Sequence, residues 1–334
     1  MRMKDRSIGP GRREVVAAGL AWAGAAMADA RIAASREPLF DSHAHLVSPD
    51  TIRYPQVPAD APGATANLPG MGFRQFGTAR PVPGAEAMAG WMKQKGVDGL
   101  AAIQKRGAYG LDNRYILDSA AHYPHLFFPV VILDAQDDAT PGTVRDLAAR
   151  GLAGVRLTGV MASDGGFPWL ASDRALRLWD TAAKTGLVME IMTNPFGHPV
   201  EALPVYVDLA LRFPGVPIVI DHLNWPDAHG APDFGLDAPL RALAARPNIF
   251  FKFTTINMDK LQDAGISSAA FLAHAVGLFG AGRILWGSDM GNTPGSYAEL
   301  IGRARASAGH LPMAARRAVF HDNGRRLFTR RAGV

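Results

Sequence analysis

The chain reads Phe40-Asp41-Ser42-His43-Ala44-His45-Leu46 at the end of its first short apolar run. If this run is a β-strand, alternate side chains share a face, so His43 and His45 point the same way. Imidazole nitrogen is the commonest protein ligand for a transition metal, and two such rings at a strand end are typical of half a catalytic centre. Two surface histidines beside a turn are the alternative interpretation, and the rest of the chain decides between the two.

Short apolar runs rich in β-branched and aromatic residues recur along the chain, at Leu39–His45, Leu100–Gln104, Phe127–Leu133, Val155–Leu157, Leu187–Met192, Ile218–His222, Ile249–Phe253 and Ile284–Gly287. Segments with helical spacing lie between them, for example Ala85–Lys95, Arg114–His122, Thr143–Arg150, Arg174–Lys184, Val200–Arg212, Leu240–Ala245 and Ala269–Phe279. Strands that alternate with helices predict a parallel sheet, because parallel neighbours need a crossover connection. The repeat predicts an α/β protein with a single (β/α)8 barrel domain over residues 31–334. An open doubly wound sheet is less favoured, because two histidines stand where its Gly-rich phosphate loop would follow the first strand.

Composition narrows the class of protein further. The chain has 334 residues, of which 48% are hydrophobic and 19% charged, as expected for a globular protein. Its net charge of +5 is modest and its basic residues are scattered, so we expect a small-molecule substrate and no nucleic-acid partner. The absence of cysteine excludes disulfides, thiolate nucleophiles and sulfur-ligated metals. Composition leaves open whether the protein forms a homo-oligomer.

Residues 1–30 have the three parts of a bacterial secretory signal. A basic start that includes Arg12-Arg13 precedes an apolar stretch from Val15 to Met27, which is too short to span a bilayer. A small-residue cleavage site follows, for example Ala28-Asp29-Ala30. The paired arginines resemble a twin-arginine signal, so we expect a periplasmic or secreted protein without stable membrane insertion after cleavage. An Ala-rich helix that stays attached is the alternative.

Polar residues gather at the carboxyl ends of the predicted strands, where (β/α)8 barrels hold their active sites. Along the chain they are His43, His45, Gln104, Lys105, Arg106, Asp134, Arg156, Glu190, Asn194, Asp221, His222, Lys252, Ser288 and Asp289. Two long loops follow strands at the same end, a Pro/Gly-rich one at 46–84 and a second at 224–239. We expect the first to form a wall over the pocket.

Four of these residues predict the chemistry. The imidazoles of His43, His45 and His222, with the Asp289 carboxylate, suit Zn²⁺ or Mn²⁺, which would polarise a carbonyl group and acidify a bound water. Asp289 could ligate the ion and also act as general base, with His222 as a catalytic partner. The same four residues could also work without metal, with the histidines donating hydrogen bonds to the carbonyl oxygen. The sequence does not separate the two modes.

The order and spacing of several motifs resemble the amidohydrolase superfamily, in its amidohydrolase-2 branch. The motifs are Asp41-x-His43-x-His45, Ile220-Asp221-His222 and Trp286-Gly287-Ser288-Asp289. Further segments are similar to the 2-pyrone-4,6-dicarboxylate lactonase-like hydrolases, namely Ile103-Gln104, Tyr109-Gly110-Leu111-Asp112-Asn113-Arg114, Gly154-Val155-Arg156-Leu157 and Asn323-Gly324-Arg325-Arg326-Leu327-Phe328. The resemblance implies a distorted (β/α)8 barrel that hydrolyses a lactone or related carbonyl, with histidines on the metal or carbonyl and Asp289 as base.

The chain departs from this pattern twice. Many metal-bound members carry a histidine in the fifth strand, whereas Leu187–Met192 has none, so Glu190 could replace it or the site could be free of metal. The lactonase pattern has Trp-Pro after the aspartate, whereas Met290-Gly291-Asn292-Thr293-Pro294 follows here, so the dicarboxylate substrate is not carried over.

Other residues receive weaker assignments. We expect Arg156, Gln104, Glu190, Asn194 and Trp225 to bind substrate, although Arg156 could equally pair with a carboxylate inside the barrel. Lys105 and Arg106 are interpreted as solvated loop charges, and Lys252 as structural rather than catalytic.

The favoured function is hydrolysis of a lactone or a related ester or amide of a small organic acid, with water activated by Asp289. A metal-dependent non-oxidative decarboxylase on the same fold is the alternative, because relatives in the same branch use this barrel to hold a carboxylate. A barrel that only binds its ligand is a second alternative. Retention of both histidines of the first motif and of the aspartate argues against it.

Overall fold

The computed structural model describes residues 37–58 and 82–329. The segment 1–30, for which the sequence predicts a signal peptide, lies outside the described residues. Within the described ranges no helix is long and apolar enough to cross a membrane.

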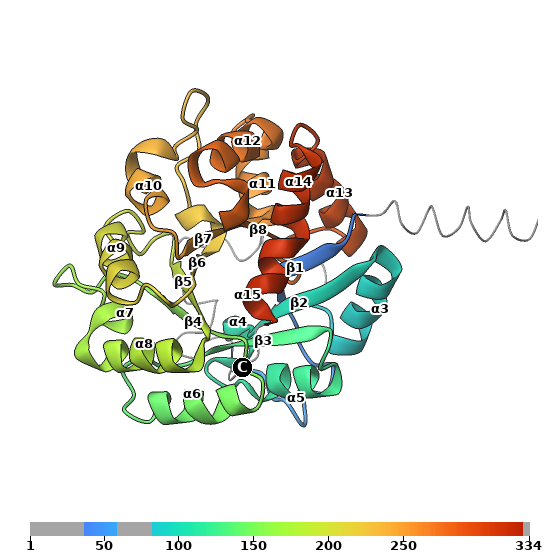
Figure 1. Cartoon of the computed structure of the whole chain (residues 1–334). Coiled ribbons are helices and arrows are strands. Elements are labelled where there is room, and N and C mark those ends of the chain that lie inside the picture. Colours follow the sequence, from blue (N-terminus) through green and yellow to red (C-terminus); the bar gives the residue numbers. More distant parts are fainter. Residues whose placement is uncertain (1–36, 59–81, 330–334) are drawn as a thin grey trace, which may run out of the picture. The chain divides into compact units, whose positions relative to one another are not determined.

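Eight parallel strands form one sheet in the order of the chain, and helices surround it (Figure 1). The strands are β1 (Leu39–His45), β2 (Val97–Ile103), β3 (Phe127–Ile132), β4 (Gly154–Gly159), β5 (Val188–Thr193), β6 (Ile218–Ile220), β7 (Ile249–Thr254) and β8 (Ile284–Gly287). The sequence prediction of a (β/α)8 barrel is confirmed. Strand ends differ from prediction by a few residues, and the difference matters at β6, which ends before Asp221 and His222.

The barrel closes between β1 and the segment that follows β8. The backbone N–H of Asp289 donates to the carbonyl of His43 at 2.7 Å, and the N–H of His45 donates to the carbonyl of Met290 at 2.9 Å. These two hydrogen bonds flank the two histidines of the first motif, so closure of the barrel also brings Asp289 to them.

All the predicted helices are present, as α3 (Ala85–Lys95), α5 (Arg114–His122), α6 (Thr140–Ala149), α8 (Asp173–Thr185), α9 (Leu203–Arg212), α10 (Asp237–Ala244) and α12 (Ser268–Phe279). Further helices are α4 (Arg106–Tyr109), α7 (Pro168–Ala171), α11 (Thr255–Asp263), α13 (Tyr297–Ser307), α14 (Met313–Arg317) and α15 (Asn323–Phe328). Short 3-10 or π turns add η2 (Asp221–Asn224), η3 (Ala281–Arg283) and η4 (Ala318–Asp322).

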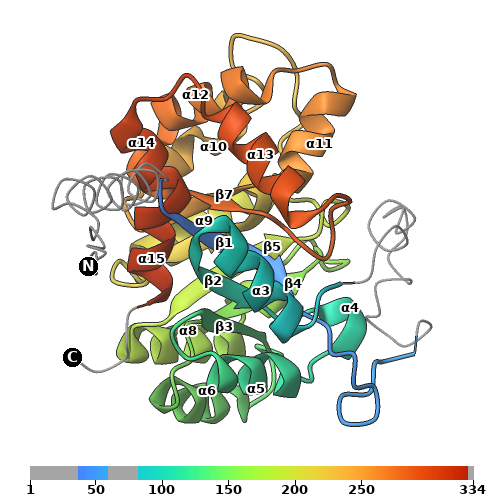
Figure 2. The ribbon, with the colours of Figure 1, turned by 90° about the vertical axis from the view of Figure 1, so that its right-hand side faces the viewer.

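The C-terminal helix α15 packs against the starts of the strands. Its Leu327 and Phe328 belong to the same buried cluster as Phe40 and Phe250, which lie at the amino-terminal ends of β1 and β7. Figure 2 shows α15 at one end of the barrel and α4 at the other. Apolar side chains therefore close the end of the barrel that is opposite the predicted site.

The long connection after β1 begins by packing on α4 and α5. The N–H of Ser48 donates to the Tyr109 hydroxyl at 2.7 Å, and the N–H of Val57 donates to the carbonyl of Ala108 at 2.8 Å. Residues 59–81 of this connection lie outside the described ranges, so its role as a wall over the pocket stays a prediction.

Candidate active site

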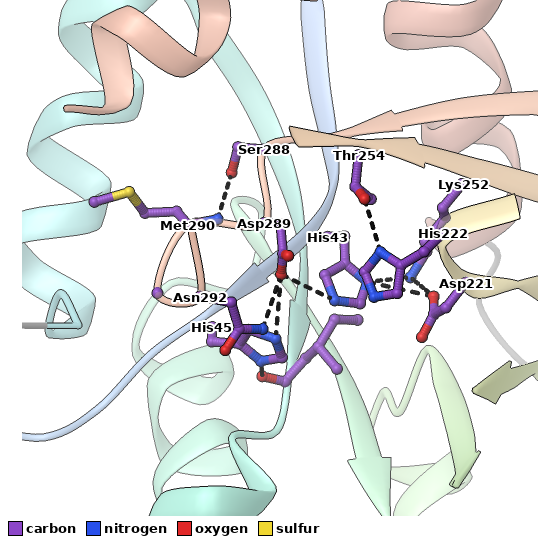
Figure 3. Close-up of polar contacts among 12 residues, drawn as sticks. His43, His45, Asp221, His222, Lys252, Thr254, Ser288, Asp289, Met290 and Asn292 are labelled. Carbon is purple, nitrogen blue, oxygen red and sulfur yellow. Dashed lines mark hydrogen bonds and ion pairs between the residues drawn. The ribbon is translucent and has the colours of Figure 1, made fainter. Parts of the chain in front are cut away.

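The two histidines of β1 both lie inside the barrel, as the alternation of the strand predicts. His43 is fully buried and His45 is 2% exposed. Their ring centroids lie 5.1 Å apart, and the His222 ring lies 5.1 Å from His43 on another side. The structure therefore brings together three imidazoles from β1 and from the turn after β6 (Figure 3).

Asp289 completes the group from the end of β8. Its Oδ1 lies 3.5 Å from Nε2 of His43 and 3.6 Å from Nε2 of His45. Nδ2 of Asn292 donates to the same oxygen at 3.0 Å. The backbone approaches closely here, because a Cβ at Gly287 would lie 2.5 Å from the Cβ of His43. The glycine of the Trp-Gly-Ser-Asp motif is thus required for β8 to sit against β1.

A buried carboxylate beneath the histidines ties β1 to β8. Oδ1 of Asp41 accepts the N–H of Ser288 at 2.9 Å and that of His43 at 3.1 Å, and the Tyr297 hydroxyl donates to Oδ2 at 3.1 Å. Burial raises the pKa of Asp41 to about 6, while these hydrogen bonds oppose the rise. Asp41 therefore orients the backbone on both sides of the site.

His222 is presented by an unusual turn and not by a strand. The prediction that the strand extends to His222 is wrong, because Ile220 ends β6 and the next residues turn into the left-handed region. The φ angles of His222, Leu223, Asn224 and Trp225 lie between 51° and 58°, without any glycine. Left-handed backbone costs roughly 1–2 kcal/mol per non-glycine residue, so surrounding contacts must hold this turn.

Residues from β5, β7 and α11 supply those contacts. Nδ2 of Asn257 donates to the carbonyl of His222 at 2.8 Å. Oγ1 of Thr254 lies 2.7 Å from Nδ1 of the His222 ring. The indole N–H of Trp225 donates to the carbonyl of Thr193 at 2.8 Å, and its ring lies 4.4 Å from that of His222. Trp225, predicted as a pocket wall, is thus fixed beside an imidazole of the site.

Four buried charges form a network below the histidines. Arg156 contacts Asp221 at 2.8 Å, and Nζ of Lys252 lies 2.5 Å from Glu190 and 3.3 Å from Asp221. Nζ of Lys252 also lies 3.0 Å from Nδ1 of His43. Two cations balance two carboxylates, which explains how these groups can be buried at all. Arg156 pairs inside the barrel, one of the two roles that the sequence leaves open.

Burial shifts the ionisation of the site. It raises the pKa of Asp289 to about 7, against the opposing Asn292 hydrogen bond and Lys105 charge. Burial and the Asp221 carboxylate also raise the pKa of Glu190, while the charges of Lys252 and Arg156 oppose the rise. Burial lowers the pKa of His43 to about 3 and depresses those of His45 and His222. Near neutral pH the site therefore combines neutral imidazoles with a carboxyl group poised to exchange a proton.

Lys105 differs from its prediction as a solvated loop charge. It is half-buried, and its ammonium contacts Asn292 and donates to the carbonyl of Gly291 at 3.1 Å. Burial lowers its pKa to about 8, although the nearby Asp289 carboxylate opposes the shift. Arg106 is also half-buried, and its guanidinium donates to the carbonyl of Thr158 at 3.4 Å.

Two residues expected to bind substrate also hold loops. The side-chain amide of Gln104 donates to the carbonyl of Gly110 at 2.8 Å and to that of Asp112 at 3.3 Å. Oδ1 of Asn194 accepts the N–H of Phe196 at 3.0 Å. Asp134, also in the predicted ring of polar residues, is exposed and accepts the N–H of Gln136.

The donors of the site fit a divalent ion. The ligand atoms of His43, His45 and Asp289 lie within 4.8 Å of one another, as do those of His43, Asp221 and His222. Nε2 of both β1 histidines and Oδ2 of Asp289 are buried and have no hydrogen-bond partner among the described residues. Imidazole and carboxylate are the donors that Zn²⁺ and Mn²⁺ accept. Glu190, the expected substitute ligand, lies in the charge network with Lys252 and belongs to neither group.

The chain belongs to the amidohydrolase family. The Amidohydro_2 family model, described as Amidohydrolase, matches residues 40–330. No curated protein matched the sequence.

Similar solved structures share the fold. A candidate 2-pyrone-4,6-dicarboxylic acid hydrolase from Pseudomonas putida is 24% identical, with a TM-score of 0.65 and coverage of 88% of this chain and 98% of that one. A zinc-bound amidohydrolase from Burkholderia multivorans is 20% identical, with a TM-score of 0.64 and coverage of 87% and 99%. A manganese-bound 5-carboxyvanillate decarboxylase from Novosphingobium aromaticivorans is 12% identical, with a TM-score of 0.60 and coverage of 88% and 97%.

The sequence predicts the histidines and the aspartate of the site, but not the side chains that hold them in place. The sequence predicts a structural role for Lys252, yet its ammonium contacts His43 directly. A lysine inside the apolar run of β7 was the available signal, because lysine is almost never fully buried unless it is paired. Asn257 and Asn292 carried no signal, since only the fold brings them to His222 and Asp289.

Proposed function

We propose that this chain hydrolyses a lactone, or a related ester or amide, of a small organic acid. The placement of Asp289 supports the proposal above all. Its carboxylate is buried, lies 3.5 and 3.6 Å from two imidazole nitrogens, and has a pKa raised to about 7. A base with this pKa takes a proton efficiently from water near neutral pH.

In the proposed reaction, Asp289 accepts the proton of a water molecule as it attacks the carbonyl carbon. The imidazoles of His43 and His45 lie beside this carboxylate, and the His222 ring lies against that of His43. In the proposal these rings face the carbonyl oxygen, on which negative charge develops. A neutral ring with its proton on the facing nitrogen donates a hydrogen bond to that oxygen. The protonated Asp289 then returns its proton to the departing oxygen or nitrogen.

A divalent ion is the proposed cofactor, held by His43, His45 and Asp289, whose ligand atoms are grouped within 4.8 Å. Zn²⁺ or Mn²⁺ there would polarise the carbonyl group and lower the pKa of a bound water.

We further propose that Trp225 forms one wall of the substrate pocket. We also propose that the protein acts in the periplasm or outside the cell.

Non-oxidative decarboxylation is the second candidate. The raised pKa of Asp289 favours it too, because a carboxyl group that is partly protonated at neutral pH can give its proton to the carbon that loses carbon dioxide. A decarboxylase is also among the similar structures.

Product analysis separates the candidates. Purified full-length protein is incubated with a panel of lactones and with a panel of aromatic hydroxy acids, in water enriched in ¹⁸O. The hydrolase proposal expects a ring-opened acid with one ¹⁸O in its new carboxyl group and no carbon dioxide. Carbon dioxide from a hydroxy acid would favour the second candidate. Binding of lactones without turnover would indicate a barrel that only binds its ligand.

A further inference from the structure

The two histidines of β1 face opposite kinds of partner through Nδ1. Nδ1 of His45 lies 3.0 Å from the backbone oxygen of Ile103, which can only accept a hydrogen bond. Nδ1 of His43 lies 3.0 Å from Nζ of Lys252, and an ammonium can only donate. The proton of the neutral His45 ring is therefore on Nδ1, whereas Nδ1 of His43 must carry a lone pair.

The ammonium of Lys252 is held in place from several sides. The side chain is fully buried, and Nζ lies 2.5 Å from Oε2 of Glu190 and 3.3 Å from Oδ1 of Asp221. It also lies 5.5 Å from the centre of the Phe328 ring. The ammonium thus lies between two buried carboxylates, Glu190 and Asp221, and compensates both in a dry environment.

We propose that Lys252 is a positioning residue that holds His43 in the tautomer with its proton on Nε2. The two histidines then present opposite groups to the space beside Asp289. His43 offers an N–H, which can donate to a carbonyl oxygen, and His45 offers a lone pair. The inference concerns the site of the proposed function but does not depend on which bond is broken.

The contact between Lys252 and His43 also competes with the binding of a metal ion at His43. An ion bound through Nε2 needs the ring proton on Nδ1, and a ligating histidine almost always donates that N–H to an acceptor. Oδ1 of Asp221, at 3.4 Å, and Oε1 of Glu190, at 3.6 Å, are the acceptors near Nδ1. Lys252 lies closer than either, so it weakens metal binding by competing for Nδ1.

The first test measures the tautomers in the wild-type protein. Full-length protein labelled with ¹⁵N in histidine, and freed of metal with a chelator, is studied by NMR through couplings from ring carbons to ring nitrogens. His43→Gln and His45→Gln assign the signals. We expect a protonated Nε2 for His43 and a protonated Nδ1 for His45. The same tautomer at both positions would overturn the proposal.

The second test measures metal affinity. Zn²⁺ is titrated calorimetrically into the wild type, Lys252→Met and a control variant, Lys93→Met, whose lysine is exposed on α3. We expect Lys252→Met to bind Zn²⁺ about tenfold or more tightly, the scale on which partners of metal ligands act, and the control to match the wild type. Equal or weaker binding by a folded Lys252→Met protein contradicts the competition. If this variant does not fold, the tautomers of the wild type decide. Neither readout uses turnover, so a failed lactone assay leaves both results standing.

Discussion

Arg156 contacts one oxygen of Asp221 through two nitrogens, with both Nε and Nη2 2.8 Å from Oδ2. The other oxygen, Oδ1, is left to face Lys252 at 3.3 Å and His43 at 3.4 Å. Burial alone would raise the pKa of Asp221, but the charges of Lys252 and Arg156 hold it well below its usual range. Asp221 therefore joins β4 to β7 and stays ionised below the histidines.

Replacing Arg156 by Met should destabilise the protein. Removal of one partner leaves Asp221 buried and undercompensated, which costs about 3–5 kcal/mol in free energy of unfolding. Urea denaturation measures the loss. Arg145→Met, at an exposed position of α6, is the control and should change stability by less than about 0.5 kcal/mol. Equal stability of the two variants would show that the pair contributes nothing measurable.

Asp289→Asn should abolish turnover while the fold is retained. The amide cannot accept the proton of the attacking water, and loss of a general base lowers the rate by about 10²–10⁴-fold. The rate constant kcat on the best lactone and the far-ultraviolet circular dichroism spectrum are the two measurements. Asp146→Asn, at an exposed position of α6, is the matched control. A variant with near-normal kcat would rule out Asp289 as the base.

The pH dependence of hydrolysis should follow Asp289. Because burial raises the pKa of this carboxyl group to about 7, the base form increases as pH rises through that value. We therefore expect kcat/KM to increase with pH, to show an inflection near pH 7, and to be low at pH values below that inflection. Initial rates measured from about pH 5 to about pH 9, roughly two units on either side of that pKa, test this. An inflection near the ordinary aspartate value of about 4 would contradict it.

Ionisation of Asp41 should make the stability of the protein depend on pH. Its pKa is about 6 in the folded protein against an ordinary 3.8. Between these values the folded state binds more protons than the unfolded state, so stability falls as pH rises. The stability of the wild type relative to Asp41→Asn should thus be greatest below about pH 4 and decline through about pH 6. The midpoints of urea denaturation of the two proteins across this pH range give the difference in stability. A stability advantage of the wild type that increases with pH would contradict the prediction.

Alanine substitution should have opposite effects on stability at two glycines. At Gly287 the added Cβ would lie 2.5 Å from the Cβ and 3.0 Å from the backbone nitrogen of His43, so we expect a loss of about 1–3 kcal/mol. At Gly277, inside α12, nothing lies within 4 Å of the added Cβ. Gly277→Ala should therefore stabilise the helix by about 0.5–1 kcal/mol. Thermal unfolding compares them, and a harmless Gly287→Ala would refute the close approach.

The periodic parts of the fold could be predicted from the sequence. Apolar runs and helical spacing identified β1 and β8 with their observed bounds, and the alternation within β1 placed His43 and His45 on one face. Order and spacing also indicated that Asp289 would join them. These features are local or follow from the rule that parallel strands end at the same rim, so a single sequence is enough.

The turn at His222 and the charge network could not be predicted in the same way. The segment from Asp221 to Trp225 contains no glycine to signal positive φ, and its contacts come from Thr254 and Asn257 on later elements. Arg156, Asp221 and Lys252 lie on different strands or turns, so no spacing relates them. The predicted signal peptide lies outside the described residues, so both the signal peptide and export of the protein stay predictions.

The seam between β1 and the residues after β8 has a consequence for how activity is acquired. Asp289 and His43 are held together by the backbone hydrogen bond that closes the barrel, so a barrel without its last strand would have the imidazoles of β1 but not the carboxylate beside them. Recovery of turnover after dilution from denaturant would therefore require the docking of that final strand, whereas circular dichroism registers helices wherever they form.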